Sequence, residues 1–240
     1  MELNSLSIVI MVLVVPASFV LSSAAGFGGS LILVPALVLA IGAKQGVALA
    51  ALLLAVNNLA KMGAYRKSLP IVESLLIAVA VMLGAAVGAS LMVKAPESWI
   101  KVMVMAMLLA TLAGDFFVTG PVRKAWALLL ALISGATSGF SGTSGPLKGV
   151  ALRSLQLERQ YFVGAASIVS LVGDMTKTAV FTHSGLLTQP QLLLAAGLMP
   201  VMILCTLAGR RLNHQVGEKG YTALFWAVMA GYAARLVFAS

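Results

Sequence analysis

The residues best suited to chemistry lie in two short glycine-rich segments that interrupt long apolar runs. The first is Gly26–Ser30 (GFGGS), and the second begins 113 residues later with Gly139–Thr143 (GFSGT) and continues into Ser144. Glycine lets a backbone approach a ligand closely, and a helix that begins inside a membrane presents free N–H groups and a positive dipole end that favour an anion. Serine and threonine hydroxyls add hydrogen-bond donors. The two segments therefore predict an anion site formed by Gly26, Phe27, Gly28, Gly29, Ser30, Gly139, Phe140, Ser141, Gly142, Thr143 and Ser144.

Close helix packing is the alternative explanation of the same two segments. A stripe of glycine and serine allows two membrane helices to approach closely, and this needs no ligand. Both glycine-rich segments interrupt an apolar run at the same place, and helix packing alone does not require this. The shared position of the two interruptions therefore favours the anion site.

Five polar residues inside otherwise apolar segments form a second group of candidates for the anion site: Asn57, Asn58, Lys61, Asp174 and Lys177. Charges in a membrane are energetically unfavourable and usually face a cavity or a partner. Asp174 and Lys177 are three residues apart and are able to pair on one helical face, which is a purely structural role. Lys61 is close enough to Arg66 to extend towards the membrane surface instead. Lys148, after the second glycine-rich segment, is a further candidate for contacting an anion or a headgroup.

An enzymatic alternative rests on Gly139–Gly142 (GFSG), which fits the Gly-x-Ser-Gly nucleophile motif of rhomboid intramembrane proteases. Ser141 would then need a histidine base on a neighbouring helix, and the sequence holds only His183 and His214, both at the ends of apolar runs. The matching residue of the first copy is Gly28, so backbone geometry explains the motif better than catalysis. Because the sequence has no metal-ligand cluster, nucleotide loop or cofactor fingerprint, we expect no catalytic residue, metal or cofactor.

Composition assigns the chain to the membrane. Of its 240 residues, 60% are hydrophobic and only 10% are charged, with a mean hydropathy of +1.04, which leaves too little polar surface for a soluble globule. The net charge of +9 comes from sixteen basic residues, most of them scattered in short gaps between apolar runs. Topology signals are found in such gaps, so we expect no nucleic-acid partner. No basic segment precedes the first apolar run, so we also expect no cleaved signal peptide.

Ten apolar runs are predicted to be helices, and the chain divides into halves, 1–120 and 121–240, that together form one membrane domain. A helix needs about twenty apolar residues to span the hydrocarbon core. Six runs qualify, beginning at Gly46, Ile71, Ile100, Tyr161, Gln191 and Tyr221. The four runs beside the glycine-rich segments are shorter: Ser7–Ala24, Gly28–Ile41, Ala125–Ser138 and Thr143–Leu152. Each glycine-rich pair is therefore either a re-entrant hairpin or one kinked span.

Basic residues in the loops distinguish these two topologies. If each glycine-rich pair returns to its starting side, nine basic residues lie on one side and four on the other, whereas one crossing per pair gives eight against five. Cytoplasmic loops carry the excess of Lys and Arg, so the hairpin topology is favoured, with both termini outside the cytoplasm. The predicted fold is then an all-α integral membrane protein of two inverted repeats, each with a glycine-motif helix pair and three full spans. Such repeats bring broken helices together near the membrane midplane.

Weaker matches elsewhere support the duplication. Asn58–Lys61 (NLAK) corresponds to Asp174–Lys177 (DMTK) at a spacing of 116 residues. Gly88–Leu91 (GASL) corresponds to Gly209–Leu212 (GRRL), and the order of the matches is the same in both halves. A small insertion in the second half accounts for the change in spacing from 113 to 116.

The duplicated segments resemble a known family, the TauE/SafE sulfite exporter family of bacterial and plant membrane proteins. The resemblance is carried by Ala25–Ser30 (AGFGGS), Val34–Pro35 and Ser134–Pro146, with Ser30 where the family often has a third glycine. It implies a secondary transporter of the bacterial inner membrane that exports small organosulfur anions, such as sulfite, sulfoacetate or a related sulfonate, by alternating access. Its partners are then a small anionic substrate and the lipid bilayer.

The sequence leaves the mode of transport open. An anion channel shares the site chemistry and differs by showing single-channel currents rather than saturable flux. A homodimer is compatible with the sequence, and neither the transported anion nor a coupling ion is identified by it. Export of a monovalent anion from a negative-inside cell is favoured by about 2.3 kcal/mol per 100 mV, so a coupling ion is not required.

The inverted topology predicts that the C-terminus lies outside the cytoplasm. A reporter that is active on only one side of the membrane, fused to Ser240, should report a non-cytoplasmic location. The same reporter placed in the basic loop at Arg66–Lys67 is the control and should report the cytoplasmic side. A cytoplasmic signal from the Ser240 fusion would contradict the inverted topology.

Overall fold

The fold is seen in a computed structural model that describes residues 13–25, 29–117, 123–144 and 146–212. These residues form helices and short connections, with no β-strand among them. In chain order the elements are α2 (Val15–Ala25), α3 (Gly29–Ile41), α4 (Ala43–Ala64), the 3₁₀ turn η2 (Arg66–Ser68), α5 (Ile71–Lys94), α6 (Glu97–Phe117), α7 (Lys124–Ser141), α8 (Leu147–Arg153), α9 (Arg159–His183) and α10 (Gln189–Leu212). The predicted all-helical class is confirmed for this part of the chain. The predictions for Gly26, Phe27, Gly28, His214, Ser240 and the run from Tyr221 lie outside the described residues.

The two glycine-rich breaks differ in where the next helix begins. After the first break, α3 is described from Gly29 to Ile41, within the predicted run Gly28–Ile41, whose first residue lies outside the described residues. After the second break, α8 begins at Leu147, so the prediction of a helix from Thr143 is wrong. Gly142 ends α7 with a φ of 79°, and Pro146 lacks an N–H donor and disfavours helix in the residue before it. With seven residues, α8 is also shorter than the predicted run.

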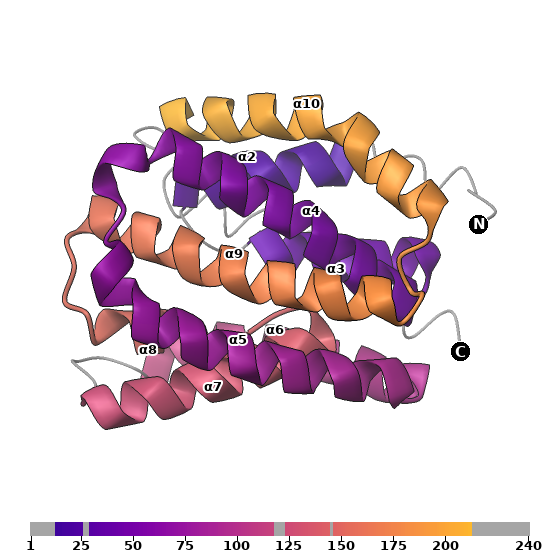
Figure 1. The fold of residues 1–240 in the computed structure, drawn as a ribbon, viewed down its shortest axis with the longest axis horizontal. Helices are drawn as coiled ribbons and strands as arrows, with labels where there is room; N and C mark the ends of the chain where they lie inside the picture. Colours follow the sequence, from indigo (N-terminus) through magenta and orange to yellow (C-terminus); the bar gives the residue numbers. More distant parts are fainter. Residues whose placement is uncertain (1–12, 26–28, 118–122, 145, 213–240) are drawn as a thin grey trace.

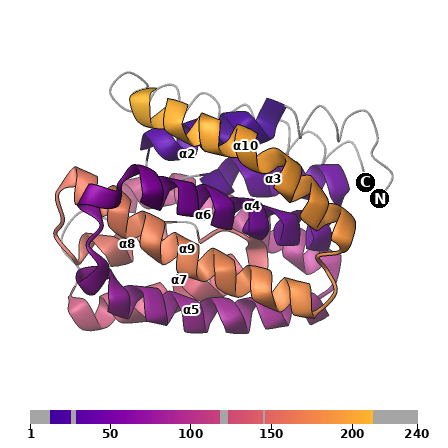
Figure 2. The same ribbon diagram turned by 45° about the horizontal axis from the view of Figure 1, so that its top comes forward.

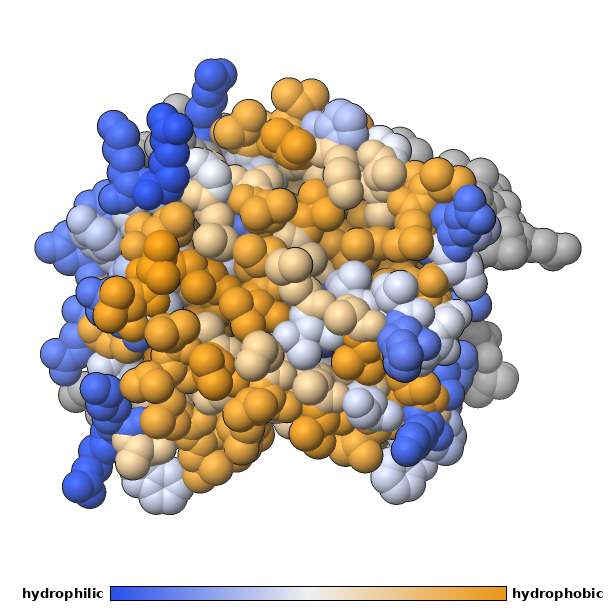
Figure 3. All heavy atoms as spheres, in the orientation of Figure 1, coloured by the Kyte–Doolittle hydropathy of each residue, from blue (hydrophilic) through white to orange (hydrophobic). Residues whose placement is uncertain are grey.

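An apolar band with polar ends marks the protein as a membrane protein. Among the described residues, three helices are long and apolar enough to cross a bilayer: Ala43–Ala64, Ile71–Lys94 and Gln189–Gly209. Two further runs predicted as spans lie in α6 and α9, which have 21 and 25 residues. Figure 3 shows hydrophobic residues across the middle of the molecule and hydrophilic ones gathered at its two ends. The long helices in Figure 1 run between these ends, as helices that cross a bilayer do.

The helices surround two central ones, α4 and α9 (Figures 1 and 2). The pair α5–α7 lies on one side of them and the pair α2–α10 on the other. Each pair joins a helix of the first half to a helix of the second. The start of α9 is close to the end of α4, because Gly164 contacts the carbonyl group of Ser68. The central helices, which correspond to each other in the duplicated sequence, therefore run in opposite directions.

Matching glycine contacts hold the two outer pairs together. A Cβ atom at Gly88 of α5 would collide with the carbonyl oxygen of Ala136 in α7. A Cβ atom at Gly209 of α10 would collide in the same way with the carbonyl oxygen of Val20 in α2. Gly88 and Gly209 are matched in the predicted repeat, and Val20 precedes Ala136 by 116 residues. The same close contact between the halves is therefore made twice, which small residues at membrane helix interfaces permit.

A tight hairpin of α3 and α4 brings the first break next to the polar residues of α4. Gly42 joins the two helices with a φ of 92°, a conformation that other residues resist. Gly46 allows α4 to pack directly on the backbone of Leu37 and Val38. The start of α3 is consequently held beside the second half of α4.

Gly84→Ala should destabilise the protein, because the new Cβ atom would meet the carbonyl oxygen of Leu132 in α7. Overpacking of this kind typically costs about 1–3 kcal/mol. Gly63→Ala is the matched control, since Gly63 is also inside a helix but has no atom within 4 Å of an added Cβ atom. Thermal unfolding of the purified protein in detergent should begin at a lower temperature for Gly84→Ala only. Equal unfolding temperatures for the two variants would contradict the close α5–α7 contact.

Candidate functional site

A small polar cavity lies where the two halves of the chain meet. It has a volume of about 30 Å³, enough for roughly one or two water molecules. The first half contributes Ser22, Gly29, Ser30, Leu54, Asn58 and Lys61, and the second half contributes Ser138, Gly142, Lys148, Ser170 and Asp174. Six of these were predicted site residues: Gly29, Ser30, Asn58, Lys61, Gly142 and Asp174, and a seventh, Lys148, was the further candidate. Both breaks therefore reach the same cavity.

Lys61 and Asn58 project into the cavity from α4. Lys61 is 3% exposed, and its Nζ atom donates a hydrogen bond to Ser22 Oγ at 3.2 Å. It therefore does not extend to the membrane surface. Asn58 donates from Nδ2 to Asp174 Oδ2 at 2.7 Å, whereas its buried Oδ1 atom has no hydrogen-bond partner among the described residues. The cavity wall thus contains a buried amine and an unpaired buried acceptor.

Lys177 of α9 repeats the contact of Lys61 in the second half. Its Nζ atom donates to Ser138 Oγ at 3.0 Å, and the serine precedes the lysine by 39 residues in both halves. Lys177 also forms an ion pair of 2.7 Å with Asp174, which confirms the pairing predicted from their spacing. Lys61 has no carboxylate partner in the described part of the chain, because Asn58 occupies the place that corresponds to Asp174. Among the described residues, Lys177 therefore pairs directly with the carboxylate, whereas Lys61 only shares the cavity with it.

Lys148 of α8 brings a third lysine to the cavity. Its Nζ atom donates to Ser170 Oγ of α9 at 2.8 Å, and both residues line the cavity. The described residues in and beside the cavity therefore carry three amines and one carboxylate. Buried charges without a partner are strongly unfavourable, so this arrangement is suited to holding an anion.

Two contacts join equivalent positions of the two halves directly. Asn58 and Asp174 are 116 residues apart and share a hydrogen bond. Ser30 Oγ lies 3.5 Å from Thr143 Oγ1, at the 113-residue spacing of the glycine-rich segments. The cavity therefore lies where positions that the sequence matches between the two halves come together.

Asn57 and Gly139 support the cavity without lining it. Asn57 donates to Ser22 Oγ at 3.2 Å and accepts a hydrogen bond from Thr206 Oγ1 at 3.0 Å, which fixes the serine in place. Gly139 lies against the backbone of α5 at Ala85. This is the close-packing role that was the alternative to an anion site.

Ser141 is held by the backbone around the second break. Its Oγ atom lies 2.8 Å from the carbonyl oxygen of Thr137 and 3.0 Å from that of Thr143. Ser141 is buried, whereas His183 at the end of α9 is exposed. The geometry accounts for Ser141 as a serine that caps the end of α7.

The remaining candidates of this segment are also outside the cavity lining. Phe140 packs against the main hydrophobic core, and Thr143 and Ser144 are buried.

Sequence reasoning missed three serines that line the cavity. Ser22 and Ser138 are 116 residues apart, which is also the spacing of the two lysines that they contact. A comparison of polar residues at this spacing identifies them. Ser170 gives no such signal, because the residue 116 positions before it is Leu54.

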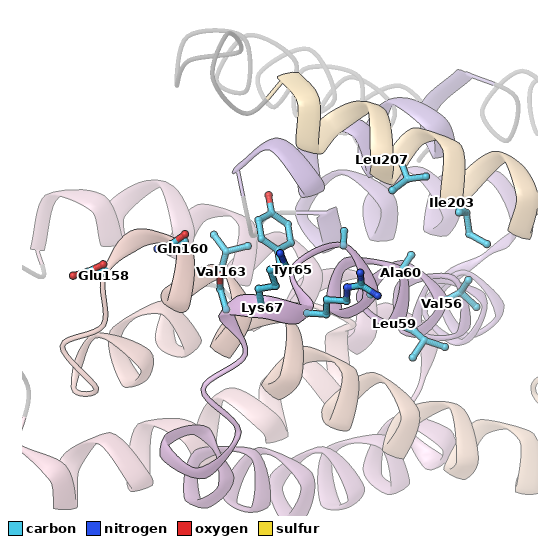
Figure 4. A pocket seen from close by; sticks show the side chains of 14 residues that line it. Val56, Leu59, Ala60, Tyr65, Lys67, Glu158, Gln160, Val163, Ile203 and Leu207 are labelled. Atoms are coloured by element: carbon cyan, nitrogen blue, oxygen red, sulfur yellow. The ribbon is translucent and has the colours of Figure 1, made fainter.

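A larger groove of about 980 Å³ lies on the outer surface between α4, α9 and α10 (Figure 4). Its lining is apolar at Val56, Leu59, Ile203 and Leu207 and polar at Tyr65, Lys67, Glu158 and Gln160. Lys61, Lys148 and Lys177 are all absent from its lining. We therefore place the candidate site in the small cavity, where the charges are, and not in this larger groove.

Comparison with known proteins tests the resemblance noted in the sequence. The chain matches the family described as "Sulfite exporter TauE/SafE" over residues 10–236. This match includes both glycine-rich segments and both buried Ser–Lys pairs. Neither the curated proteins nor the solved structures contain a significant match. The chain therefore belongs to the TauE/SafE sulfite exporter family of membrane transporters.

Proposed function

We propose that the protein is a secondary transporter that exports a small sulfur-containing anion, such as sulfite, sulfoacetate or a related sulfonate, across a bacterial inner membrane. The observation that carries this proposal is the buried cavity in which Lys61 and Lys148 have no carboxylate partner among the described residues. Lys61 is buried and Lys148 is half-buried in the same cavity, so their ammonium groups repel each other, and an anion bound beside them relieves that repulsion. Membership of the TauE/SafE family supports a sulfur oxyanion as that ligand.

Hydroxyl groups around the lysines suit an oxyanion. Ser22 and Ser170 each accept a hydrogen bond from a lysine, so within the described part of the chain their own O–H groups remain available as donors. Ser30 and Ser138 supply two more hydroxyl groups to the lining. Sulfite and sulfonate oxygens are acceptors, and hydrogen bonds from an ammonium group to an anion are stronger than neutral ones.

We further infer that the two halves are inverted repeats that expose the cavity alternately to the two sides of the membrane. The opposite directions of α4 and α9 support this inference, as do the matching α5–α7 and α2–α10 contacts. A site between two such repeats opens to either side when one repeat rocks against the other. The membrane potential, at about 2.3 kcal/mol per charge and 100 mV, drives the anion outwards.

Lys61→Met should weaken anion binding, because it removes the buried ammonium group but retains an unbranched apolar side chain. Loss of a hydrogen bond to a charged group is worth about 1.5–3 kcal/mol, which corresponds to a roughly 10- to 100-fold higher Kd. Thermal-shift titrations of the purified protein with sulfite, sulfoacetate and simple carboxylates measure this effect, since a ligand that binds the folded state raises its stability.

Lys67→Met is the matched control for this experiment, because Lys67 is exposed and does not line the cavity. It should bind sulfite as the wild type does. Equal affinity of the Lys61→Met and Lys67→Met variants would remove Lys61 from the site. The absence of a shift with every anion in the wild type would overturn the anion site itself.

Ser141→Ala should leave transport in reconstituted vesicles nearly unchanged, because the Ser141 hydroxyl contacts the backbone carbonyl of Thr137 and not the cavity. An intramembrane protease with Ser141 as nucleophile would instead lose nearly all activity. Ser22→Ala is the positive control, since it removes the hydrogen-bond partner of Lys61 and should reduce flux. Abolished flux in a folded Ser141→Ala variant would contradict the structural role of this serine.

A further inference from the structure

The duplication of the cavity is incomplete at one place. Lys148 and Ser170 form a hydrogen-bonded pair on the second-half side of the cavity. In the first half, the helix that follows the break, Gly29–Ile41 (GSLILVPALVLAI), contains no charged residue. Leu54 precedes Ser170 by 116 residues and lines the same cavity. The second half therefore places an ammonium and a hydroxyl group where the first half places apolar side chains.

This difference sets the charge that a ligand meets. Asp174 forms an ion pair of 2.7 Å with Lys177, so without Lys148 the only cavity lysine would be Lys61, which has no carboxylate at ion-pair distance among the described residues. Lys148 adds a second amine to the lining that has no carboxylate at that distance. In a poorly polarisable interior, two cations attract a dianion much more strongly than a monoanion. A monoanion would leave one of the two ammonium groups without a counter-charge.

We propose that Lys148 and Ser170 form a subsite that makes the cavity selective for divalent over monovalent oxyanions. This proposal rests on the anion site proposed above and specifies the charge of its ligand. Lys148 supplies the second charge, and Ser170 acts as a positioning residue that holds the ammonium group at the cavity through the hydrogen bond of 2.8 Å. The dianion lies between Lys61 of α4 and Lys148 of α8, and so contacts both halves of the chain.

Sulfate and methanesulfonate are the probes that isolate charge. Both have a tetrahedral sulfur with at least three oxygens, but at pH 7.5 sulfate is a dianion and methanesulfonate a monoanion. Affinities of the purified full-length protein for both are measured by thermal-shift titration at constant ionic strength. The wild type should bind sulfate more tightly than methanesulfonate.

Lys148→Met should weaken sulfate binding roughly 10- to 100-fold, as expected for loss of a charged hydrogen bond, and should change methanesulfonate binding much less. The ratio of the two affinities is the decisive quantity, because a variant that merely loosens the fold weakens both ligands alike. Lys148→Arg retains the charge and should retain the preference for sulfate.

Ser170→Leu introduces the residue type that the first half has at the matching position, Leu54. It should reduce the preference for sulfate without removing the lysine. This variant tests the subsite even if Lys148→Met does not fold.

One result would overturn this proposal while leaving the anion site intact. It is an unchanged ratio of sulfate to methanesulfonate affinity in the Lys148→Met and Ser170→Leu variants, whether both affinities fall equally or neither falls. Failure of the wild type to bind any anion, including sulfite, would overturn the proposed transport function and the subsite with it. Lys67→Met, which alters an exposed lysine outside the cavity, should match the wild type for both probes.

Discussion

Positive charge buried within the membrane is the constraint on which the rest of this structure depends. Lysines at the centre of a membrane protein are unfavourable without partners, and the fold supplies those partners from helices that are distant in sequence. Lys61 and Lys177 each reach a serine 39 residues earlier, which ties α4 to α2 and α9 to α7. The hydrogen bond between Asn58 and Asp174 then joins the two halves across the centre. The polar contacts that satisfy the charges are therefore also the contacts that fix how the helices are arranged.

Small residues make this arrangement sterically feasible, and the two halves use them differently at one matched position. In the second half, Gly139 brings α7 against the backbone of α5 at Ala85. Within the helices before the breaks, α2 and α7 correspond at a spacing of 116 residues, as for Ser22 and Ser138, although the glycine-rich segments themselves correspond at 113. At that spacing Gly139 is matched by Ser23, which donates a hydrogen bond of 2.7 Å to the carbonyl oxygen of Thr206 in α10. One position thus serves backbone packing in one half and a hydrogen bond in the other. Both solutions bring a helix of one half close to a helix of the other.

The sequence predicted the helices and the buried charges well, because each follows from a strong physical signal. Lys61 and Asp174 stand out in apolar runs, where charge is rare, and both line the cavity. The roles of the glycines were less predictable, since a residue without a side chain permits both close packing and access to a ligand. Gly142 lines the cavity whereas Gly139 packs against a helix, and only the position of the neighbouring backbone decides between these roles. The start of α8 differs from the prediction because apolar character alone does not mark a helix start, whereas Pro146 disfavours helix in the residue before it.

The departures from exact duplication around the cavity are related to each other by charge. Asp174 stands where the first half has Asn58, and it compensates one positive charge, that of Lys177. Lys148 has no charged counterpart in the first half and adds one positive charge. The negative charge of Asp174 and the positive charge of Lys148 cancel, so the two differences together leave the net charge of the cavity region unchanged. Their effect is that the positive charge without a direct carboxylate partner lies on α8 and not on α9. In the proposed mechanism the anion is consequently held between Lys61 of one half and Lys148 of the other. Any movement that separates the halves weakens both attractions at once, which links the opening of the cavity to release of the anion.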